Sequence, residues 1–212
     1  MEALEILLAR YPVLGPCRDS LAAAVAAMIA CYEADGTVFT CGNGGSAADA
    51  DHIVGELLKG FTHPRPLPQA DQRRLCELDP ADGRLLADRL QCGLRAFSLM
   101  SQTAITTAVG NDLGEALAPA QQLYGLGRPG DVLIALSTSG NARNVALAAQ
   151  VARFRNMTVI GLTGADGGRL ARLADIAIQV PAQLTYQIQE LHLPVYHALC
   201  IAVENHFFPP RT

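Results

Sequence analysis

The chain contains no tryptophan and few other aromatic residues, which together make up 5% of its 212 residues. It also lacks a basic cluster, since 16 Lys and Arg face 20 Asp and Glu, giving a net charge of −4. Binding along a nucleic-acid backbone needs a row of Lys or Arg to neutralise phosphates. We therefore expect no nucleic-acid partner, while small anionic ligands can still bind through backbone amides.

Paired cysteine motifs and targeting segments are also missing. The six cysteines have no CxxC spacing and lie in apolar stretches, which indicates reduced core residues. They are Cys17, Cys31, Cys41, Cys76, Cys92 and Cys200. The N-terminus has no basic region followed by an apolar block, and the Ala-rich run 21–31 is too short to span a bilayer. We expect a cytoplasmic location and no membrane partner.

Half of the residues are apolar, enough for one well-buried domain, so we expect a single domain over residues 1–212. Short apolar, β-branched segments alternate with helical patterns. This order predicts a three-layer α/β fold around a doubly wound, five-stranded parallel sheet with right-handed connections. The predicted strands are Thr37–Cys41, Leu94–Leu99, Asp131–Leu136, Met157–Leu162 and Asp175–Val180.

Residues 1–34 are expected to form N-terminal helices. The second of them is apolar around most of its circumference, which makes it a candidate oligomer contact. Residues 62–93 form a polar helical excursion, because three prolines and a run of charges interrupt the pattern. The predicted helices are Glu2–Arg10, Cys17–Ala34, one beginning at Ser46, Leu75–Leu78, Arg84–Leu90, Thr103–Val109, Glu115–Leu126, Ala142–Phe154, Arg169–Leu173 and Leu184–Phe208.

The rest of the chain is organised around residues 37–60, TVFTCGNGGSAADADHIVGELLKG. A buried strand leads into Gly42-Asn43-Gly44-Gly45, which lets the backbone approach a ligand, and Ser46 then begins a helix. The free N–H groups and positive dipole end of that helix suit a phosphate. The alternative is a plain glycine turn with Ser46 as the N-cap residue.

On the same helix, His52 and Glu56 are four residues apart and share one face. Such a pair suits metal binding or proton transfer, although it is often a surface contact. Its position directly after the glycine turn favours a functional role. Lys59 and Arg65 follow as further candidates to reach a substrate phosphate.

A second candidate phosphate site is Ser137-Thr138-Ser139-Gly140, where hydroxyls and backbone amides precede another helix. An ordinary Ser/Thr turn is the alternative. Two such turns, with no Walker Lys-Ser/Thr, favour a phosphorylated metabolite over a nucleotide. Ligands of parallel sheets bind beyond the carboxyl ends of the strands, where both turns and Asp112 fall.

The last predicted helix holds Gln189, Glu190, His192 and His197 among apolar residues. A lone histidine in such a helix is usually a core residue. Gln189 and His197 lie about 80° apart around the helix and about 12 Å apart along it, so they can converge only on a metal or substrate between them. Pro194 is expected to kink or loosen this turn.

Five ordered motifs, CGNGGSAADADHIVGELL, VGND, LSTSGNA, LTGADGG and YQIQELHLPVYH, together resemble the phosphoheptose isomerases of the SIS (sugar isomerase) domain superfamily. The resemblance covers about residues 17–61 and 94–208. It implies a flavodoxin-like SIS fold and a homotetramer with active sites between subunits. It also implies conversion of sedoheptulose 7-phosphate into D-glycero-D-manno-heptose 7-phosphate.

The resemblance implies roles for individual residues. Glu56 and His197 would be the acid–base pair, and His52, Glu56, Gln189 and His197 would hold zinc. The substrate would contact Asn43, Gly44, Gly45, Ser46, Asp112, Ser137, Thr138, Ser139 and Gln189. Glu56 would move the proton from C1 to C2 through a cis-enediol(ate), while His197 serves the O1 and O2 protons.

The sequence departs from the family pattern at three places. Ala142 stands where a further phosphate-binding serine is common, Tyr186-Gln187 replaces a frequent Asp-Arg pair, and the 62–91 excursion is long. One alternative is therefore an isomerase or sensor for another sugar phosphate. A second is a non-catalytic SIS protein that binds a partner such as a replication-initiation factor. The ending Phe207-Phe208-Pro209 faintly resembles the ending of SIS proteins of that kind.

Overall fold

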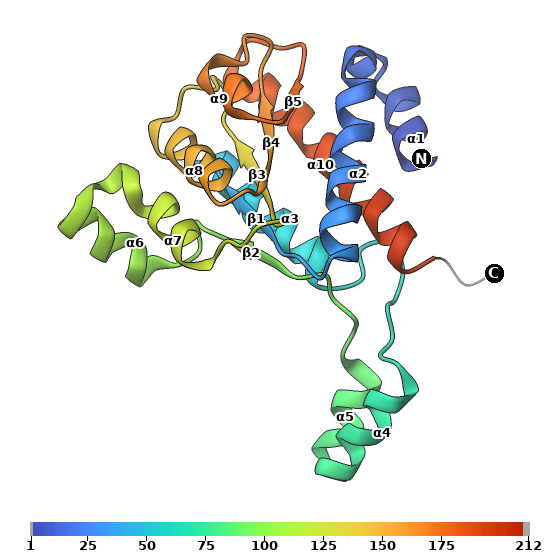
Figure 1. Ribbon diagram of the computed structural model, residues 1–212. Coiled ribbons are helices and arrows are strands. Elements are labelled where there is room, and N and C mark those ends of the chain that lie inside the picture. The colour runs from blue at the N-terminus through green and yellow to red at the C-terminus, as the bar shows by residue number, and fades with distance from the viewer. Residues whose placement is uncertain (1, 210–212) are drawn as a thin grey trace.

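A computed structural model describes residues 2–209 and places five parallel strands in one sheet, in the order β2-β1-β3-β4-β5 (Figure 1). The strands are β1 (Val38–Cys41), β2 (Ala96–Ser98), β3 (Val132–Leu136), β4 (Thr158–Thr163) and β5 (Ile176–Gln179). Every neighbouring pair is parallel. The predicted three-layer α/β fold is confirmed, and each strand end agrees with its prediction to within two residues.

Alternating side chains of the buried strands build two separate cores, as expected for a sheet covered on both faces. Val132, Ile134 and Leu136 of β3 pack in the larger core, and Leu133 and Ala135 in the other. The larger core holds α1 (Glu2–Arg10), α2 (Arg18–Glu33), α3 (Gly45–Leu58) and α10 (Thr185–Phe207). The other face carries α7 (Ala118–Leu126), α8 (Arg143–Phe154) and α9 (Gly168–Leu173).

The N-terminal segment differs slightly from the prediction. A 3-10 helix, η1 (Pro12–Cys17), precedes α2, so α2 begins at Arg18 and not at Cys17. By length and composition the segment Pro12–Glu33 would suffice to cross a membrane. In the structure, however, Leu21, Val25 and Met28 of this segment pack in the larger core, as the core helix of a globular domain does.

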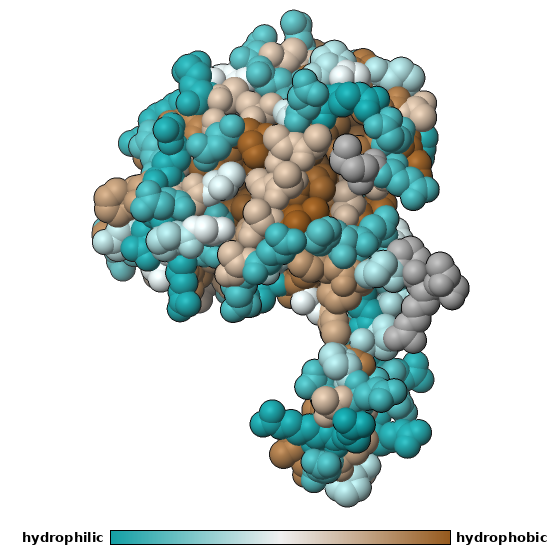
Figure 2. All heavy atoms as spheres, turned by 45° about the vertical axis from the view of Figure 1, so that its right-hand side comes forward, coloured by the Kyte–Doolittle hydropathy of each residue, from teal (hydrophilic) through white to brown (hydrophobic). Residues whose placement is uncertain are grey.

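The polar excursion forms a helical hairpin that projects from the body of the molecule (Figure 1) and has a mostly hydrophilic surface (Figure 2). It consists of α4 (Gln69–Leu78) and α5 (Asp82–Arg89). The prediction for the first helix was too short by six residues, because Pro68 ends the extended segment and Asp71 favours a helix start there. A Cβ at Gly83 would lie 2.1 Å from the carbonyl oxygen of Leu75, so glycine permits this close packing.

From Thr103 to the end of α7 at Leu126 the chain is helical throughout. After α6 (Thr103–Val109), the predicted turn at Gly110-Asn111-Asp112 is a π-helical turn, η2 (Gly110–Gly114), and a 3-10 turn, η3 (Glu115–Leu117), precedes α7. The predicted helix Glu115–Leu126 is therefore α-helical only from Ala118. Pro119 lies in the first turn of α7, where its missing N–H costs no helix bond.

The final helix, α10, continues through Pro194 without a break, so the expected loosening of the helix does not interrupt it. The hydrogen bond lost at Pro194 would have reached the carbonyl of Glu190, an exposed residue whose carbonyl water can satisfy. All six cysteines are free. Cys17, Cys31, Cys41 and Cys200 are buried as predicted, whereas Cys76 and Cys92 are only half-buried.

Candidate functional site

The glycine-rich turn after β1 needs its glycines for two physical reasons. Gly44 has φ +55°, which disfavours a side chain, and a Cβ at Gly42 would lie 2.3 Å from the carbonyl oxygen of Ser46. The N-cap of α3 is Gly44, so Ser46 lies inside the first turn and is not the capping residue. Ser46 is buried, at 3% exposure. The turn therefore owes its shape to close backbone packing, and the simple capping role for Ser46 is wrong.

The Ser/Thr turn after β3 lies against the turn after β4. Gly140 has φ +66°, and a Cβ there would lie 2.0 Å from the carbonyl oxygen of Gly167. The Ser137 hydroxyl accepts the Ala142 N–H at 3.4 Å, and the Ser139 hydroxyl accepts the Asn141 N–H at 3.2 Å. A hydroxyl oxygen that accepts an amide proton keeps its own proton, which it can donate to an anion.

A reciprocal amide pair joins the glycine-rich turn after β1 to the start of α8, the helix that follows the Ser/Thr turn. The Asn43 and Asn144 side chains each donate to the other at 2.8 Å. Both residues line a pocket of about 440 Å³ at the carboxyl edge of the sheet, together with Arg143, Thr106 and Glu115. Sequence analysis missed Asn144, although its position at the start of the helix after the Ser/Thr turn was a usable signal.

Asp112 takes a more peripheral place. It lies on the exposed π-helical turn η2 and accepts a hydrogen bond from its neighbour Asn111 at 2.7 Å. It does not line the pocket beside Asn43 in the described part of the chain. A substrate contact by Asp112 would therefore need a ligand that extends beyond that pocket.

The predicted acid–base residues meet where α3 and α10 lie together. The His52 Nε2 atom lies 3.0 Å from Glu56 Oε1, and Lys59 Nζ lies 3.0 Å from Glu56 Oε2. The rings of His52 and His197 are 5.0 Å apart between centroids and nearly perpendicular. His52 thus contacts both the carboxylate and the second imidazole, and all three residues belong to one chain.

His197 is held by aromatic neighbours. The rings of Phe61 and Tyr196 lie 5.2 and 4.9 Å from it. Its pKa is lowered, mainly by burial and further by the nearby His52, with Glu56 acting in the opposite direction. The ring is consequently neutral near pH 7, and within residues 2–209 its buried Nε2 has no hydrogen-bond partner. Such an atom can accept a proton or coordinate a metal.

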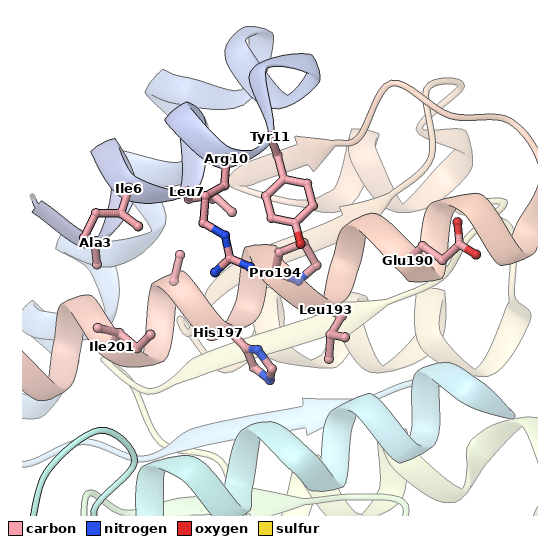
Figure 3. Close-up of a pocket in the computed structure, with 11 residues that line it drawn as sticks. Ala3, Ile6, Leu7, Arg10, Tyr11, Glu190, Leu193, Pro194, His197 and Ile201 are labelled. Atoms are coloured by element: carbon pink, nitrogen blue, oxygen red, sulfur yellow. The ribbon is translucent and has the colours of Figure 1, made fainter.

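His197 also contributes to a pocket of about 340 Å³ between α1 and α10. Figure 3 shows its ring on the side of α10 that faces α3, while Arg10 and Tyr11 approach from the end of α1. Leu7, Leu193 and Ile201 supply apolar walls. The pocket therefore has apolar walls and a polar rim formed by Arg10 and Tyr11, and it lies next to His197.

Gln189 lies at the other end of α3. A Cβ at Gly45 would lie 2.6 Å from the Gln189 Nε2 atom, so this amide covers the glycine turn. Helices α3 and α10 run side by side in the same direction, with Gln189 beside Gly45 and His197 beside His52. Gln189 and His197 are eight positions apart, which corresponds to about 12 Å along α10, so the two side chains contact different turns of α3.

No group of three or more His, Cys, Asp or Glu side chains is close enough to hold a metal among the residues that the structure describes. The donor types nevertheless fit Zn²⁺, because imidazole nitrogen and carboxylate oxygen are its usual ligands. The unpartnered His197 Nε2 and the facing His52 and Glu56 atoms agree with that chemistry. Of the four predicted ligands, His52, Glu56 and His197 therefore lie together, whereas Gln189 lies beside Gly45 at the start of α3.

Two predicted candidates have other roles in the structure. Arg65, considered as a phosphate contact, is buried at 1% exposure and pairs with Glu204, so that interpretation is wrong. His192 is fully buried, with Nε2 3.3 Å from the Thr163 carbonyl oxygen, and is a core histidine. Lys59 remains at the surface beside Glu56.

Comparisons with known proteins agree with the architecture. Two family profiles, each described as a SIS domain, match residues 15–71 and 114–202. The phosphoheptose isomerase of Rhodospirillum rubrum is 42% identical over 192 residues, covering 91% of this chain and 88% of the relative. A phosphoheptose isomerase structure from Neisseria gonorrhoeae matches with TM-score 0.69 and 36% identity, over 87% of this chain and 86% of that one. One from Francisella tularensis gives TM-score 0.72 and 32% identity, over 88% and 86%.

Proposed function

Since this chain belongs to the phosphoheptose isomerase family and is a sugar-phosphate isomerase, we propose that it converts sedoheptulose 7-phosphate into D-glycero-D-manno-heptose 7-phosphate. The observation that supports this most directly is the meeting of Glu56, His52 and His197 at one place on α3 and α10. A carboxylate and a neutral imidazole are the groups that an aldose–ketose isomerisation requires.

In this proposal the phosphate binds at the two turns. Ser46, Ser137, Thr138 and Ser139 donate to its oxygens, and Gly44 and Gly45 let the backbone come close. The Asn43–Asn144 pair holds the glycine-rich turn against the start of α8, and the contact between Gly140 and Gly167 holds the Ser/Thr turn against the turn after β4. Asn43, Asp112 and Gln189 would then bind sugar hydroxyls.

Glu56 removes the proton from C1 of the open-chain ketose and returns it to C2 of the resulting cis-enediol(ate). His197, neutral because its pKa is lowered by burial, carries the proton between O1 and O2. Lys59, 3.0 Å from Glu56, keeps a positive charge beside this carboxylate. Phe61 and Tyr196 confine the imidazole, so the proton moves through one ring orientation.

We propose zinc as the cofactor, held by His52, Glu56, Gln189 and His197. When bound, zinc supplies a Lewis acid that polarises the substrate oxygens. Support comes from the donor types and from the buried, unpartnered Nε2 of His197 within the described chain.

We further propose a cytoplasmic homotetramer with active sites between subunits. The apolar pocket between α1 and α10 adjoins His197, and Ile6 and Leu193 beside it are 52% and 41% exposed. A neighbouring subunit that covers these side chains would also exclude water from the histidine.

Another sugar phosphate is the second candidate substrate, favoured by Ala142. This residue is the N-cap of α8 and brings no hydroxyl to the phosphate turn. The non-catalytic alternative is disfavoured, because the relatives at 42% and 39% identity are named phosphoheptose isomerase, which is an enzyme. The Phe207-Phe208 ending instead packs internally, with Phe207 5.9 Å from Tyr32 and Phe208 4.8 Å from the Arg65 guanidinium.

A panel of five- to seven-carbon ketose and aldose phosphates, followed by NMR, tests the proposal. The assay is run on purified protein after chelation and again with added zinc. We expect turnover of sedoheptulose 7-phosphate above all others. Faster turnover of another ketose phosphate would replace the substrate, and no turnover of any would refute the isomerase mechanism.

A further inference from the structure

A buried phenol connects the two helices of the site. The Tyr196 hydroxyl donates to Asp49 Oδ1 at 3.1 Å and lies 3.0 Å from His52 Nδ1. Tyr196 is 1% exposed. Asp49 precedes His52 by three residues on α3, so both face α10. Neither Asp49 nor Tyr196 belongs to the acid–base or zinc set proposed above.

The donation from Tyr196 to Asp49 sets the direction of this chain of contacts. A phenol carries one proton, and donation to a carboxylate gives the stronger, charge-assisted bond. The Tyr196 oxygen then accepts the Nδ1–H of His52. With its proton on Nδ1, the imidazole keeps a lone pair on Nε2, the atom that faces Glu56 at 3.0 Å.

The far side of His52 therefore presents two electron-pair donors side by side, Nε2 of His52 and Oε1 of Glu56. Two such atoms 3.0 Å apart need a cation or proton between them. Metal-binding histidines almost always donate their second N–H to a partner that fixes ring orientation and raises ligand basicity. Here a tyrosine occupies that place and is itself oriented by a carboxylate.

We propose that Asp49 and Tyr196 are positioning residues for the metal site, acting through His52. The contacts from Asp49 through Tyr196 to His52 keep Nε2 of His52 directed toward Glu56 and so raise the affinity for zinc. This inference rests on the proposed function, in which His52 is a zinc ligand.

The test compares Tyr196→Phe with Tyr32→Phe. Both changes remove one buried hydroxyl, although Tyr32 as a whole is only partly buried. The Tyr32 hydroxyl has no hydrogen-bond partner among the described residues and lies outside the site. Zinc dissociation constants are measured by competition with a chromophoric chelator, and melting temperatures are recorded for both variants. We expect Tyr196→Phe to weaken zinc binding about 10- to 100-fold and Tyr32→Phe to bind like the wild type.

Kinetics of the zinc-loaded enzyme give the second readout. A relay that acts through His52 should lower kcat in Tyr196→Phe and leave KM for the sugar phosphate near its wild-type value. Unchanged zinc affinity in Tyr196→Phe, or equal losses in both variants, would overturn the inference. A wild-type protein that isomerises the sugar but binds no zinc would also overturn it, while leaving the isomerase proposal intact.

Discussion

Arg65 and Glu204 form an ion pair, with 2.8 Å between nitrogen and oxygen, in which neither side chain is exposed. Arg65 also donates to the carbonyls of Leu57 and Glu56, at 2.8 and 3.1 Å, and so caps the end of α3. Glu204 accepts the backbone N–H groups of Phe61 and Thr62. This pair therefore fastens the end of α3, with Glu56, to the helix that carries His197.

Replacing Glu204 with Gln should destabilise the fold by about 3–5 kcal/mol, because it leaves the Arg65 charge buried without its counter-ion. Although burial raises the pKa of Glu204, hydrogen bonds from Thr62, Phe61 and Arg65 hold that pKa below its ordinary value, so the native carboxylate is charged. Chemical denaturation measures the loss. The exposed Arg18–Glu5 pair is the control, and Arg18→Ala should leave the midpoint nearly unchanged.

The double variant Arg65→Met with Glu204→Leu separates the cost of the buried unpaired charge from the cost of the lost hydrogen bonds. Because no unpaired charge remains, we expect it to be more stable than Glu204→Gln. A double variant as unstable as the single one would indicate that the hydrogen bonds to the loop, and not the buried charge, dominate.

Glu56→Gln tests the catalytic carboxylate. The amide has nearly the same shape but cannot accept the C1 proton, so kcat should fall at least about 100-fold while the melting temperature stays close to the wild type. An aldose–ketose assay with the circular dichroism spectrum as the folding control measures both. Turnover within a few-fold of the wild type would exclude Glu56 as the base.

Much of this fold follows from local pattern, whereas the contacts that complete the site do not. The strand positions follow from short continuous apolar runs and the His52–Glu56 pair from a spacing of four residues, both of which the sequence shows directly. Tyr196 and Asp49 are 147 residues apart, and Arg65 and Glu204 are 139 apart. The pairing of these residues depends on how α10 packs against α3 and on how the chain turns back after the end of α3.

The misjudged role of Arg65 has the same cause. A charged residue after a proline-rich segment usually lies at the surface, and only the carboxylate on α10 makes its burial favourable. The early start of α4 was missed because its first six residues, 69–74, contain a single apolar side chain, Ala70, and so show no apolar period.

The pH dependence of stability should include a contribution from His192. Burial lowers the pKa of this histidine from 6.5 to about 4, so the folded state binds its proton less readily than the unfolded chain. Stability should therefore decrease as pH falls from about 6.5 to about 4, by on the order of 3 kcal/mol from this group. Urea denaturation at several pH values compares the wild type with His192→Leu, which should show a shallower decrease over that range. Parallel curves would show that other groups control the acid sensitivity.

Gly83→Ala tests how independently the α4–α5 hairpin folds. The new Cβ would lie 2.1 Å from the Leu75 carbonyl oxygen and force the two helices apart. Since α4 has no buried residue, we expect faster hydrogen exchange and proteolysis within residues 69–89, while the melting temperature of the body changes little. Gly125→Ala, where nothing lies within 4 Å of the new Cβ, is the control. A large drop in melting temperature for Gly83→Ala would mean that the hairpin and the body unfold together.

Gly140→Ala addresses the phosphate turn. The residue has φ +66°, and its new Cβ would lie 2.0 Å from the Gly167 carbonyl oxygen, a backbone atom that cannot rotate away. The left-handed conformation alone costs about 1–2 kcal/mol, and relief of the contact must separate the turns after β3 and β4. Because Ser137 and Ser139 belong to the displaced turn, KM for the sugar phosphate should rise several-fold more than kcat falls. Gly55→Ala, with nothing within 4 Å, is the matched control. If Gly140→Ala lowers stability but leaves KM unchanged, the Ser/Thr turn does not bind the phosphate.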